Sequence, residues 1–116
     1  MKNSMEIDEW GNKWWWVNGE LHREDGPAIE FENGNKAWYV NDKLHREDGP
    51  AIEGADGVKE WYVNGLRHRL DGPAVEYTDG DKAWWLNDNQ YSSLDEWLEA
   101  TDVSEQERIF LKLKWA

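Results

Sequence analysis

Residues 34–53 read GNKAWYVNDKLHREDGPAIE, and closely similar stretches lie within residues 11–33 and 57–79. A fourth copy begins at Gly80 and breaks off after Asn87. One tryptophan holds the same position in every copy, 23 residues from the next, and these are Trp15, Trp38, Trp61 and Trp84. Because the same residues recur every 23 positions through most of the chain, the sequence is that of a repeat protein.

Other positions keep the same period and give each unit a shared polar end. A histidine recurs as His22, His45 and His68, and an arginine follows each of them. An Asp-Gly-Pro step comes next, which contains Asp25, Asp48 and Asp71, followed by Gly26, Gly49 and Gly72. We expect structural roles for these residues, with His and Asp fixing the turn of each unit through hydrogen bonds.

Each unit has the pattern of a β-hairpin. Its first half, residues 36–41 in the second unit, is rich in aromatic and β-branched side chains and alternates with period two. An Asn-Gly or Asn-Asp pair follows, and these residues tolerate the positive φ of tight hairpin turns. The proline of each Asp-Gly-Pro step cannot donate to a strand ladder and is expected at a bend. The predicted fold class is mainly β, one long single-layer antiparallel sheet of about four repeated hairpins.

The repeats also set the domain organisation. The predicted boundaries are 1–10 for an N-terminal lead-in or short extra strand, 11–33, 34–56, 57–79 and a partial 80–91 for the repeats, and 92–116 for a helical cap. Ser93 with Glu96 and Ser104 with Glu107 are capping boxes that predict two short helices, the first over about 94–100 and the second from Ser104 through Lys114, with residues 101–103 as a link. These helices make the class α+β, and they either cap the last unit or form a partner-binding pair.

Composition and charge limit the classes of function. The 116 residues suffice for one domain, and 25 Asp and Glu against 13 Lys and Arg give a formal net charge of −12. This charge repels phosphates, so we expect no direct nucleic-acid partner and no membrane partner. The chain has no cysteine, no apolar run of membrane-spanning length and no apolar leader, which favours the cytoplasm. Ten tryptophans argue against disorder despite the polar average.

Period-two alternation separates two aromatic rows on opposite faces of the predicted sheet. The first row contains the four repeated tryptophans, and the second contains Trp16, Tyr39, Tyr62 and Trp85. The second row is either covered by the helices and by cross-strand stacking, or exposed as the aromatic core of an interface. A recurring row of carboxylates, Glu30, Glu53 and Glu76, is either a solvated face or a negative surface that attracts a basic partner.

The repeated histidines do not indicate a metal site or an acid–base site. Equivalent residues of successive hairpins lie two strands apart, about 10 Å, which is too far for one metal ion whose Zn–N bonds are about 2 Å. A catalytic arrangement also normally occurs once, whereas this one occurs three times. No phosphate-binding glycine loop, nucleophile elbow or unique carboxylate pair stands out, so we predict no enzyme, no metal and no cofactor.

The stretch Trp61-Tyr62-Val63-Asn64-Gly65, with His68 three residues further on, resembles the MORN repeat, which is itself a 23-residue hairpin. Residues 21–28 and 44–51, both LHREDGPA, look like a MORN-related variant found in bacteriophage and giant-virus proteins. The resemblance covers about Gly11 to Asn87. It departs from the usual pattern because an arginine replaces the glycine after the histidine, and because the Asp-Gly-Pro step is extra.

This resemblance implies a single-layer hairpin sheet and a non-enzymatic interaction role, since antitoxin-like proteins with such variant repeats act by binding another protein. The lipid-binding role ascribed to some MORN proteins is not expected without a basic patch. We therefore expect an acidic module of phage or viral type that inhibits a basic host protein, such as a nuclease, a defence protein or a toxin. The alternative is a structural or assembly module that forms homo-oligomers, and carbohydrate binding on stacked rings is a third possibility.

Overall fold

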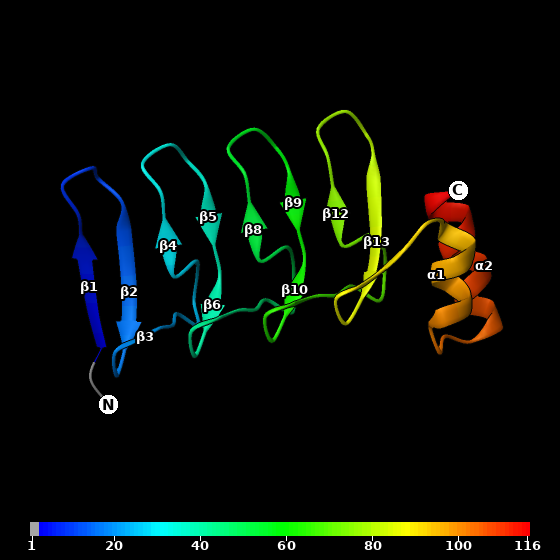
Figure 1. Ribbon diagram of the computed structural model, residues 1–116, viewed down its shortest axis with the longest axis horizontal. Helices are drawn as coiled ribbons and strands as arrows, with labels where there is room; N and C mark the ends of the chain where they lie inside the picture. The colour runs from blue at the N-terminus through cyan, green and yellow to red at the C-terminus, as the bar shows by residue number, and fades with distance from the viewer. Residues whose placement is uncertain (1–2) are drawn as a thin grey trace.

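The computed structural model describes residues 3–116 and consists of short β-strands followed by two helices (Figure 1). The longer strands are β1 (Asn3–Ile7), β2 (Lys13–Val17), β13 (Lys82–Leu86) and β14 (Asn89–Tyr91). The two-residue strands are β3 (Glu20–Leu21), β4 (Ile29–Glu30), β5 (Lys36–Ala37), β6 (Tyr39–Val40), β7 (Lys43–Leu44), β8 (Ile52–Glu53), β9 (Lys59–Glu60), β10 (Tyr62–Val63), β11 (Leu66–Arg67) and β12 (Val75–Glu76). The helices are α1 (Leu94–Ala100) and α2 (Glu105–Trp115).

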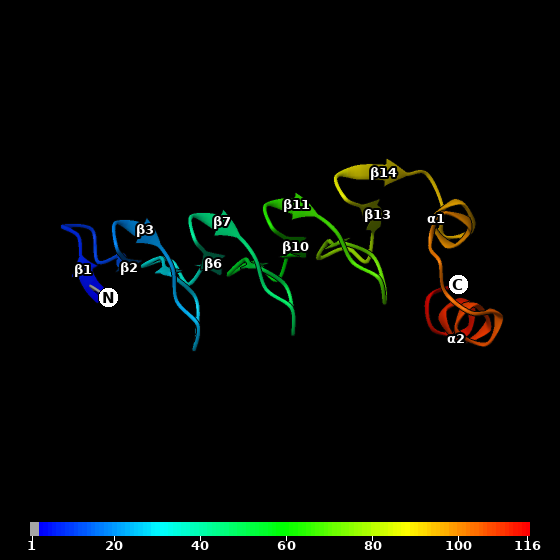
Figure 2. The ribbon, with the colours of Figure 1, turned by 90° about the horizontal axis from the view of Figure 1, so that it is seen from below.

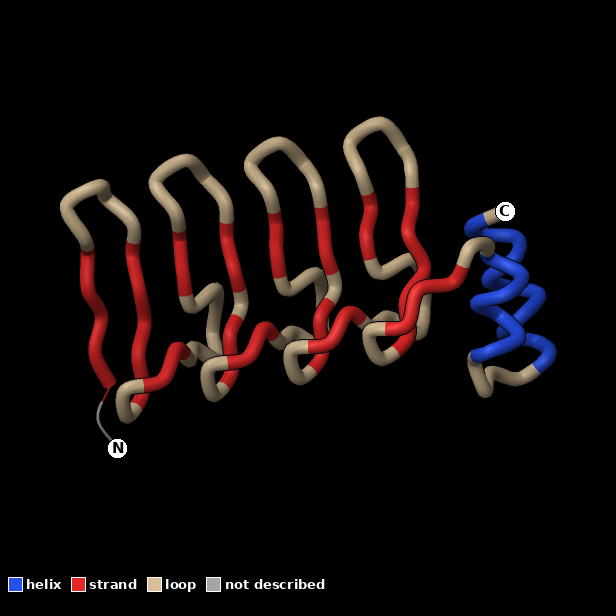
Figure 3. The backbone as a smooth tube through the Cα atoms, in the orientation of Figure 1, coloured by secondary structure: helices blue, strands red, loops and turns tan. Residues whose placement is uncertain are grey.

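The main sheet is a single antiparallel layer of tall hairpins that stand side by side (Figures 1 and 3). Its strand order is β1-β2-β4-β5-β8-β9-β12-β13-β14, so each hairpin pairs with the next one along the chain. Ala37, for example, lies between Ile29 and Ile52 in the register of the sheet. The predicted single-layer sheet of repeated hairpins is confirmed.

Each repeat also contains a shorter hairpin that leaves the foot of the tall one. The strand of the second repeat is interrupted at Trp38, whose N–H donates to Ala51 O at 2.7 Å while its C=O accepts from His45 N at 3.0 Å. β5 before Trp38 therefore pairs in the main sheet, and β6 after it pairs with β7. Figure 2 shows the short hairpins turning out of the plane of the main sheet. We expected the return segment to continue in one long sheet, but the two halves of the strand face different partners.

The tight turns of the short hairpins have the backbone that their sequences predict. The φ angle is +50° at Asn18 and +81° at Gly19, and it is +48° at Asn41 and +69° at Asp42. Positive φ at both central residues gives a turn whose twist matches the flanking strands. Asp42 adds a contact that glycine cannot make, because its Oδ1 accepts a hydrogen bond at 2.8 Å from Leu21 N of the preceding repeat.

Both predicted helix caps are confirmed. Ser93 Oγ accepts a hydrogen bond from Glu96 N at 3.1 Å, and Ser104 Oγ accepts one from Glu107 N at 3.2 Å. These bonds satisfy backbone donors that the first turn of a helix leaves without a partner. The helices therefore begin where the Ser-x-x-Glu patterns place them.

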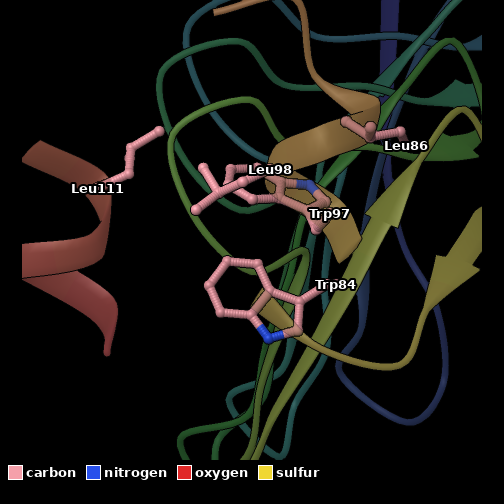
Figure 4. Packing of buried hydrophobic residues seen from close by; sticks show 5 residues of the cluster. All are labelled: Trp84, Leu86, Trp97, Leu98 and Leu111. Atoms are coloured by element: carbon pink, nitrogen blue, oxygen red, sulfur yellow. The ribbon is translucent and has the colours of Figure 1, made fainter. Parts of the chain in front are cut away.

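The helices close the C-terminal end of the array and form a buried hydrophobic cluster with it (Figure 4). The members of this cluster are Trp84, Leu86, Trp97, Leu98 and Leu111. Trp97 and Leu98 are fully buried. The helices thus hide the apolar surface of the last repeat, as the terminal unit of a repeat array must.

At the opposite end, β1 pairs with β2 from Asn3 opposite Val17 to Ile7 opposite Lys13. The N-terminal stretch is therefore a short extra strand from Asn3 onward, and Met1 and Lys2 lie outside the described residues. The molecule measures 48 × 32 × 20 Å, and its radius of gyration is 16.1 Å, against about 13 Å for a compact domain of this length. Within the described chain, no helix is both long and apolar enough to cross a membrane.

Candidate protein-binding surface

An arginine clamp recurs on the face of the first aromatic row. In the second repeat, Cζ of Arg46 lies 3.9 Å from the centre of the Trp38 ring. Its Nε donates to Asp48 Oδ1 at 2.9 Å, and its Nη1 donates to Pro50 O at 3.0 Å and to Glu53 Oε2 at 3.2 Å. The first and third repeats hold the same set of contacts, centred on Arg23 and Arg69. Stacking and charge-assisted hydrogen bonds thus fix each Asp-Gly-Pro step to a tryptophan.

The glycine of each Asp-Gly-Pro step makes room for the arginine clamp. A Cβ atom at Gly49 would lie 2.9 Å from Arg46 Cζ, and one at Gly26 would lie 3.0 Å from Arg23 Cζ. A side chain there would press against the guanidinium that stacks on the tryptophan. These glycines therefore have a structural role because the arginine guanidinium lies so close to their backbone that a side chain would not fit.

The repeated histidines tie neighbouring repeats together. Nε2 of His22 lies 3.4 Å from Glu24 Oε1, a contact within its own bend of the kind we expected. The other ring nitrogen, Nδ1, reaches the turn of the next repeat, which we did not expect. The Nδ1 atom accepts from a backbone N–H at 3.0 Å in each case, and the pairs are His22 with Asn41, His45 with Asn64, and His68 with Asn87. Nδ1 can accept only while it carries no proton, so this contact requires the neutral ring with its hydrogen on Nε2.

The surroundings of this face shift the pKa of three groups. The hydrogen bond and the positive charge of the clamp arginine lower the pKa of Asp25 and of Asp48. Burial lowers the pKa of His68, which has Leu70 two residues on, where the other two histidines have a glutamate. At pH 7 the two clamp carboxylates are therefore charged and His68 is neutral.

The predicted carboxylate row is paired with the clamps. Its members are half-buried or nearly so, and each accepts a hydrogen bond from a clamp Nη1 at 2.9 to 3.2 Å: Glu30, Glu53 and Glu76. Strongly exposed negative charge lies instead along the outer rim of the Asp-Gly-Pro steps. The side chains of this acidic rim are 82 to 87% exposed, and they are Glu24, Asp25, Glu47 and Asp48. The Arg-Glu-Asp triplet carries this rim in the sequence, and its arginine pairs with its own aspartate, as Arg46 does with Asp48.

Two equivalent grooves run between successive Asp-Gly-Pro steps on the first-row face. The first groove has residues 23–27 as one wall, and Trp38 and Val40 contribute apolar surface from the next repeat. The second groove has residues 46–50 as one wall, and Trp61 and Val63 take the same places. Their volumes are about 800 and 700 Å³, within the range of ligand sites. Each groove thus combines a tryptophan, a guanidinium and an acidic rim.

The second aromatic row is half-buried along its length. Trp16 stacks on Trp14, with ring centroids 6.2 Å apart and an interplanar angle of 12°. Arg67 Cζ lies 5.5 Å from the centre of the Tyr62 ring and 5.0 Å from that of Trp85. Part of this row is therefore engaged within the fold. The tryptophan that the helices bury, Trp84, belongs to the first row.

The geometry brings no metal ligands together. No group of three or more His, Asp or Glu side chains between residues 3 and 116 is placed to hold a metal ion. The chain matches no protein-family model, and no curated protein sequence matches it either. The resemblance to MORN repeats therefore rests on the repeat pattern itself and stays a prediction.

Proposed function

We propose that this chain is an acidic, non-enzymatic protein-binding module that docks on a basic partner protein. The observation that carries the proposal is the acidic rim, repeated beside grooves that contain tryptophan on one face of the molecule. Aromatic surface with a polar surround is typical of protein interfaces. The net charge of −12 would attract a positively charged surface and speed its association.

A finer proposal concerns the kind of partner. The resemblance of the two LHREDGPA stretches to variant repeats of phage and giant-virus proteins supports an inhibitor of viral type. Its target is then a basic host protein, such as a nuclease, a defence protein or a toxin, which is blocked when its basic surface is covered. We place this action in the cytoplasm, that of the host cell if the protein is viral, since a chain without cysteine suits a reducing compartment.

Affinity capture from a lysate at low and high salt, with matched variants, tests the binding function. Glu24→Gln combined with Glu47→Gln removes two charges of the acidic rim and leaves the clamp partners in place. Glu20→Gln combined with Glu32→Gln removes the same charge at exposed positions outside the rim. The proposal is supported if high salt releases the captured protein and if the rim variant binds that protein more weakly than the control variant does. Capture that is insensitive to salt, or equal losses for both pairs, contradicts it.

A self-associating assembly module is the second candidate, because both ends of the array expose apolar side chains. They are Met5, Ile7 and Trp10 at the N-terminal end, and Ile109, Phe110 and Leu113 on α2. β1 also has an unpaired edge within the described sheet, and such edges favour association. Sedimentation velocity at several concentrations tests this candidate. An apparent mass that rises with concentration in the natural sequence, and that stays at the monomer value in Leu113→Glu, supports this candidate. A monomer mass at every concentration rules it out.

A further inference from the structure

The helical cap occupies a third position equivalent to the two open grooves. Residues 69–73 correspond in the repeat to residues 23–27 and 46–50, and among them Asp71 and Gly72 contact Trp115 of α2. Trp84 and Leu86 provide the apolar surface of this third groove, in the place of the tryptophan and valine of the earlier repeats. The residues that cover this surface come from the helices and include Trp97, Leu98, Leu111 and Trp115, the first three of which appear in Figure 4.

Trp115 makes the contacts that characterise the filled groove. Its Nε1 donates a hydrogen bond to Asp71 O at 3.0 Å. Its ring packs against the glycine of the step so closely that a Cβ at Gly72 would lie 2.6 Å from its Cζ2 atom. Arg69 Cζ lies 5.3 Å from the centre of the same ring, and Trp84 stands edge-on to it at 6.2 Å. A backbone carbonyl, a glycine surface, a guanidinium and a second indole thus hold this side chain.

Occupation of the third groove changes the burial of its walls. Trp84 and Leu86 are each 7% exposed, and Gly72 and Pro73 are buried. The equivalent residues of the open grooves are only half-buried, and they are Trp38, Val40, Trp61, Val63, Gly26, Pro27, Gly49 and Pro50. The open grooves therefore present the same kind of surface without the side chain that buries it.

The hydrogen-bond acceptor of the third groove also has equivalents in the open ones. The backbone carbonyls of Asp25 and Asp48 correspond to the Asp71 carbonyl that Trp115 binds. Among the backbone hydrogen bonds of turns and loops in residues 3–116, none ends on either of these carbonyl oxygens. An indole in either open groove would thus find the acceptor, the glycine and the guanidinium in the arrangement that holds Trp115.

We infer that each open groove binds a tryptophan that stands beside a lysine or arginine on a helix of the partner protein. The chain's own occupant has this form, since Lys114 Nζ lies 5.2 Å from the centre of the Trp115 ring. The acidic rim favours such a basic neighbour, because Glu24 and Glu47 stand at the two open grooves where the third has Leu70. A second copy of this acidic chain is a poorer occupant, since its own Trp115 is already docked. The inference rests on the proposed function and specifies the surface that such a partner would use.

The size of the contact suits an anchoring residue. Burial of one tryptophan removes on the order of 150–250 Å² from water. Tryptophan is also prominent among the residues that carry most of the binding free energy at interfaces. Two open grooves one repeat apart, about 10 Å from the strand spacing, would allow a partner to place one or two such anchors.

Titration of the isotopically labelled full chain with synthetic peptides, followed by NMR, tests the inference. The probe peptide has the sequence of residues 104–116, and its first control carries Trp115→Ala. We expect the probe to change the chemical shifts of the Gly26 and Gly49 amides in a saturable manner. The alanine control should bind at least about tenfold more weakly. In the protein variant Val63→Trp, which fills the second groove, the Gly49 shift should disappear while the Gly26 shift remains.

Three outcomes would overturn the inference. One is the absence of saturable shifts, and a second is shifts confined to α1 and α2, which would show exchange with the chain's own helix. The third is equal affinity for the probe and the alanine control. If both peptides bind equally and salt weakens both, the groove is not a tryptophan site, but binding of a basic partner to the acidic rim remains supported. Failure of the proposed function would instead appear as salt-insensitive capture from the lysate.

Discussion

The clamp arginine shows how much of this fold depends on single side chains. Arg46 contacts an aromatic ring, two carboxylates and a backbone carbonyl, so it joins the strand, the bend and the main sheet of one repeat. Lysine cannot reproduce this set, because it lacks the planar fork that donates in two directions while it stacks. The glycine beside the guanidinium is the complementary requirement, since no other residue leaves the space free.

We expect Gly49→Ala to lower the free energy of unfolding by about 1–3 kcal/mol, because the new methyl group would press on the Arg46 guanidinium. Urea denaturation followed by tryptophan fluorescence measures the change. The control is a double-mutant cycle with Arg46→Ala, in which the methyl group meets no guanidinium and its cost should fall. An equal cost in both backgrounds would disprove the close-approach explanation.

Acidification should weaken the junction between the third and fourth repeats. Burial lowers the pKa of His68 in the folded chain, so the neutral ring contributes stability that is fully present above about pH 6.5 and is lost as the pH falls through the folded pKa. Thermal melts between about pH 7.5 and pH 5 measure this loss. His68→Asn keeps an acceptor for Asn87 N and does not titrate, so its melting temperature should fall less over this range. Parallel curves for the two proteins would contradict the assignment.

A separate loss of stability belongs to the clamp carboxylates. The pKa values of Asp25 and Asp48 are lowered in the folded chain. Their contribution is therefore present above the unfolded value of about 3.9 and is lost as the pH falls through the folded pKa. This loss begins only below about pH 3.9, whereas the loss at His68 begins below about pH 6.5.

At the scale of elements, the sequence predicts the parts whose cause is local. The Asn-Gly and Asn-Asp turns and the Ser93 and Ser104 caps each depend on side chains within about four residues, and all are found where the sequence places them. The interruption at Trp38 could not be predicted in this way. Its N–H and C=O bind partners on separate segments, and the positions of those segments depend on how the neighbouring repeats pack.

The same distinction applies to the candidate site. The arginine and histidine columns were visible in the sequence. The Nδ1 bond of each histidine to the next repeat, and the second carboxylate that each arginine binds seven residues away, were not. Trp115 shows the limit most clearly, since its partner Asp71 is 44 residues away and belongs to another kind of element. Contacts over such separations require the packed structure.

The two kinds of short turn provide a matched comparison. Asp42 has φ +69° and its carboxylate accepts from Leu21 N, whereas Gly65 holds the equivalent position in the third repeat. Asp42→Gly loses the hydrogen bond but relieves the backbone, so we expect its effect on the unfolding free energy to stay within about 0.5 kcal/mol. Asp42→Ala loses the bond and keeps the strain, so it should cost about 1–2 kcal/mol in the same urea assay. Equal effects of the two substitutions would contradict this account.

The molecule as a whole is a thin array in which each repeat contacts its neighbours. Its shortest dimension is 20 Å, and its interior contains the fully buried alanines Ala28, Ala51 and Ala74 in place of large side chains. The buried hydrophobic cluster lies at one end, between the last repeat and the helices. Stability in such an array is the sum of the repeats, their junctions and the capping unit.

We expect Trp97→Ala to remove about 3–5 kcal/mol of unfolding free energy, because it empties the centre of the capping cluster. Hydrogen exchange should show the fourth repeat losing protection before the first, since the loss begins at the cap. Leu113→Ala is the control, because that side chain is 81% exposed and its replacement should change stability by less than about 0.5 kcal/mol. Uniform loss of protection along the chain would show a single cooperative unit instead.

The histidine tie has one further consequence, which concerns how such a chain can change in length. Each of these hydrogen bonds joins Nδ1 of a histidine to the backbone N–H of an asparagine 19 residues later. Removal of residues 34–56 would therefore place Asn64 N opposite His22 Nδ1 and restore an equivalent junction between repeats. Each added or removed repeat would lengthen or shorten the molecule by about 10 Å. The length of the molecule would thereby depend on the number of repeats, while the N-terminal strand and the helical cap stay the same.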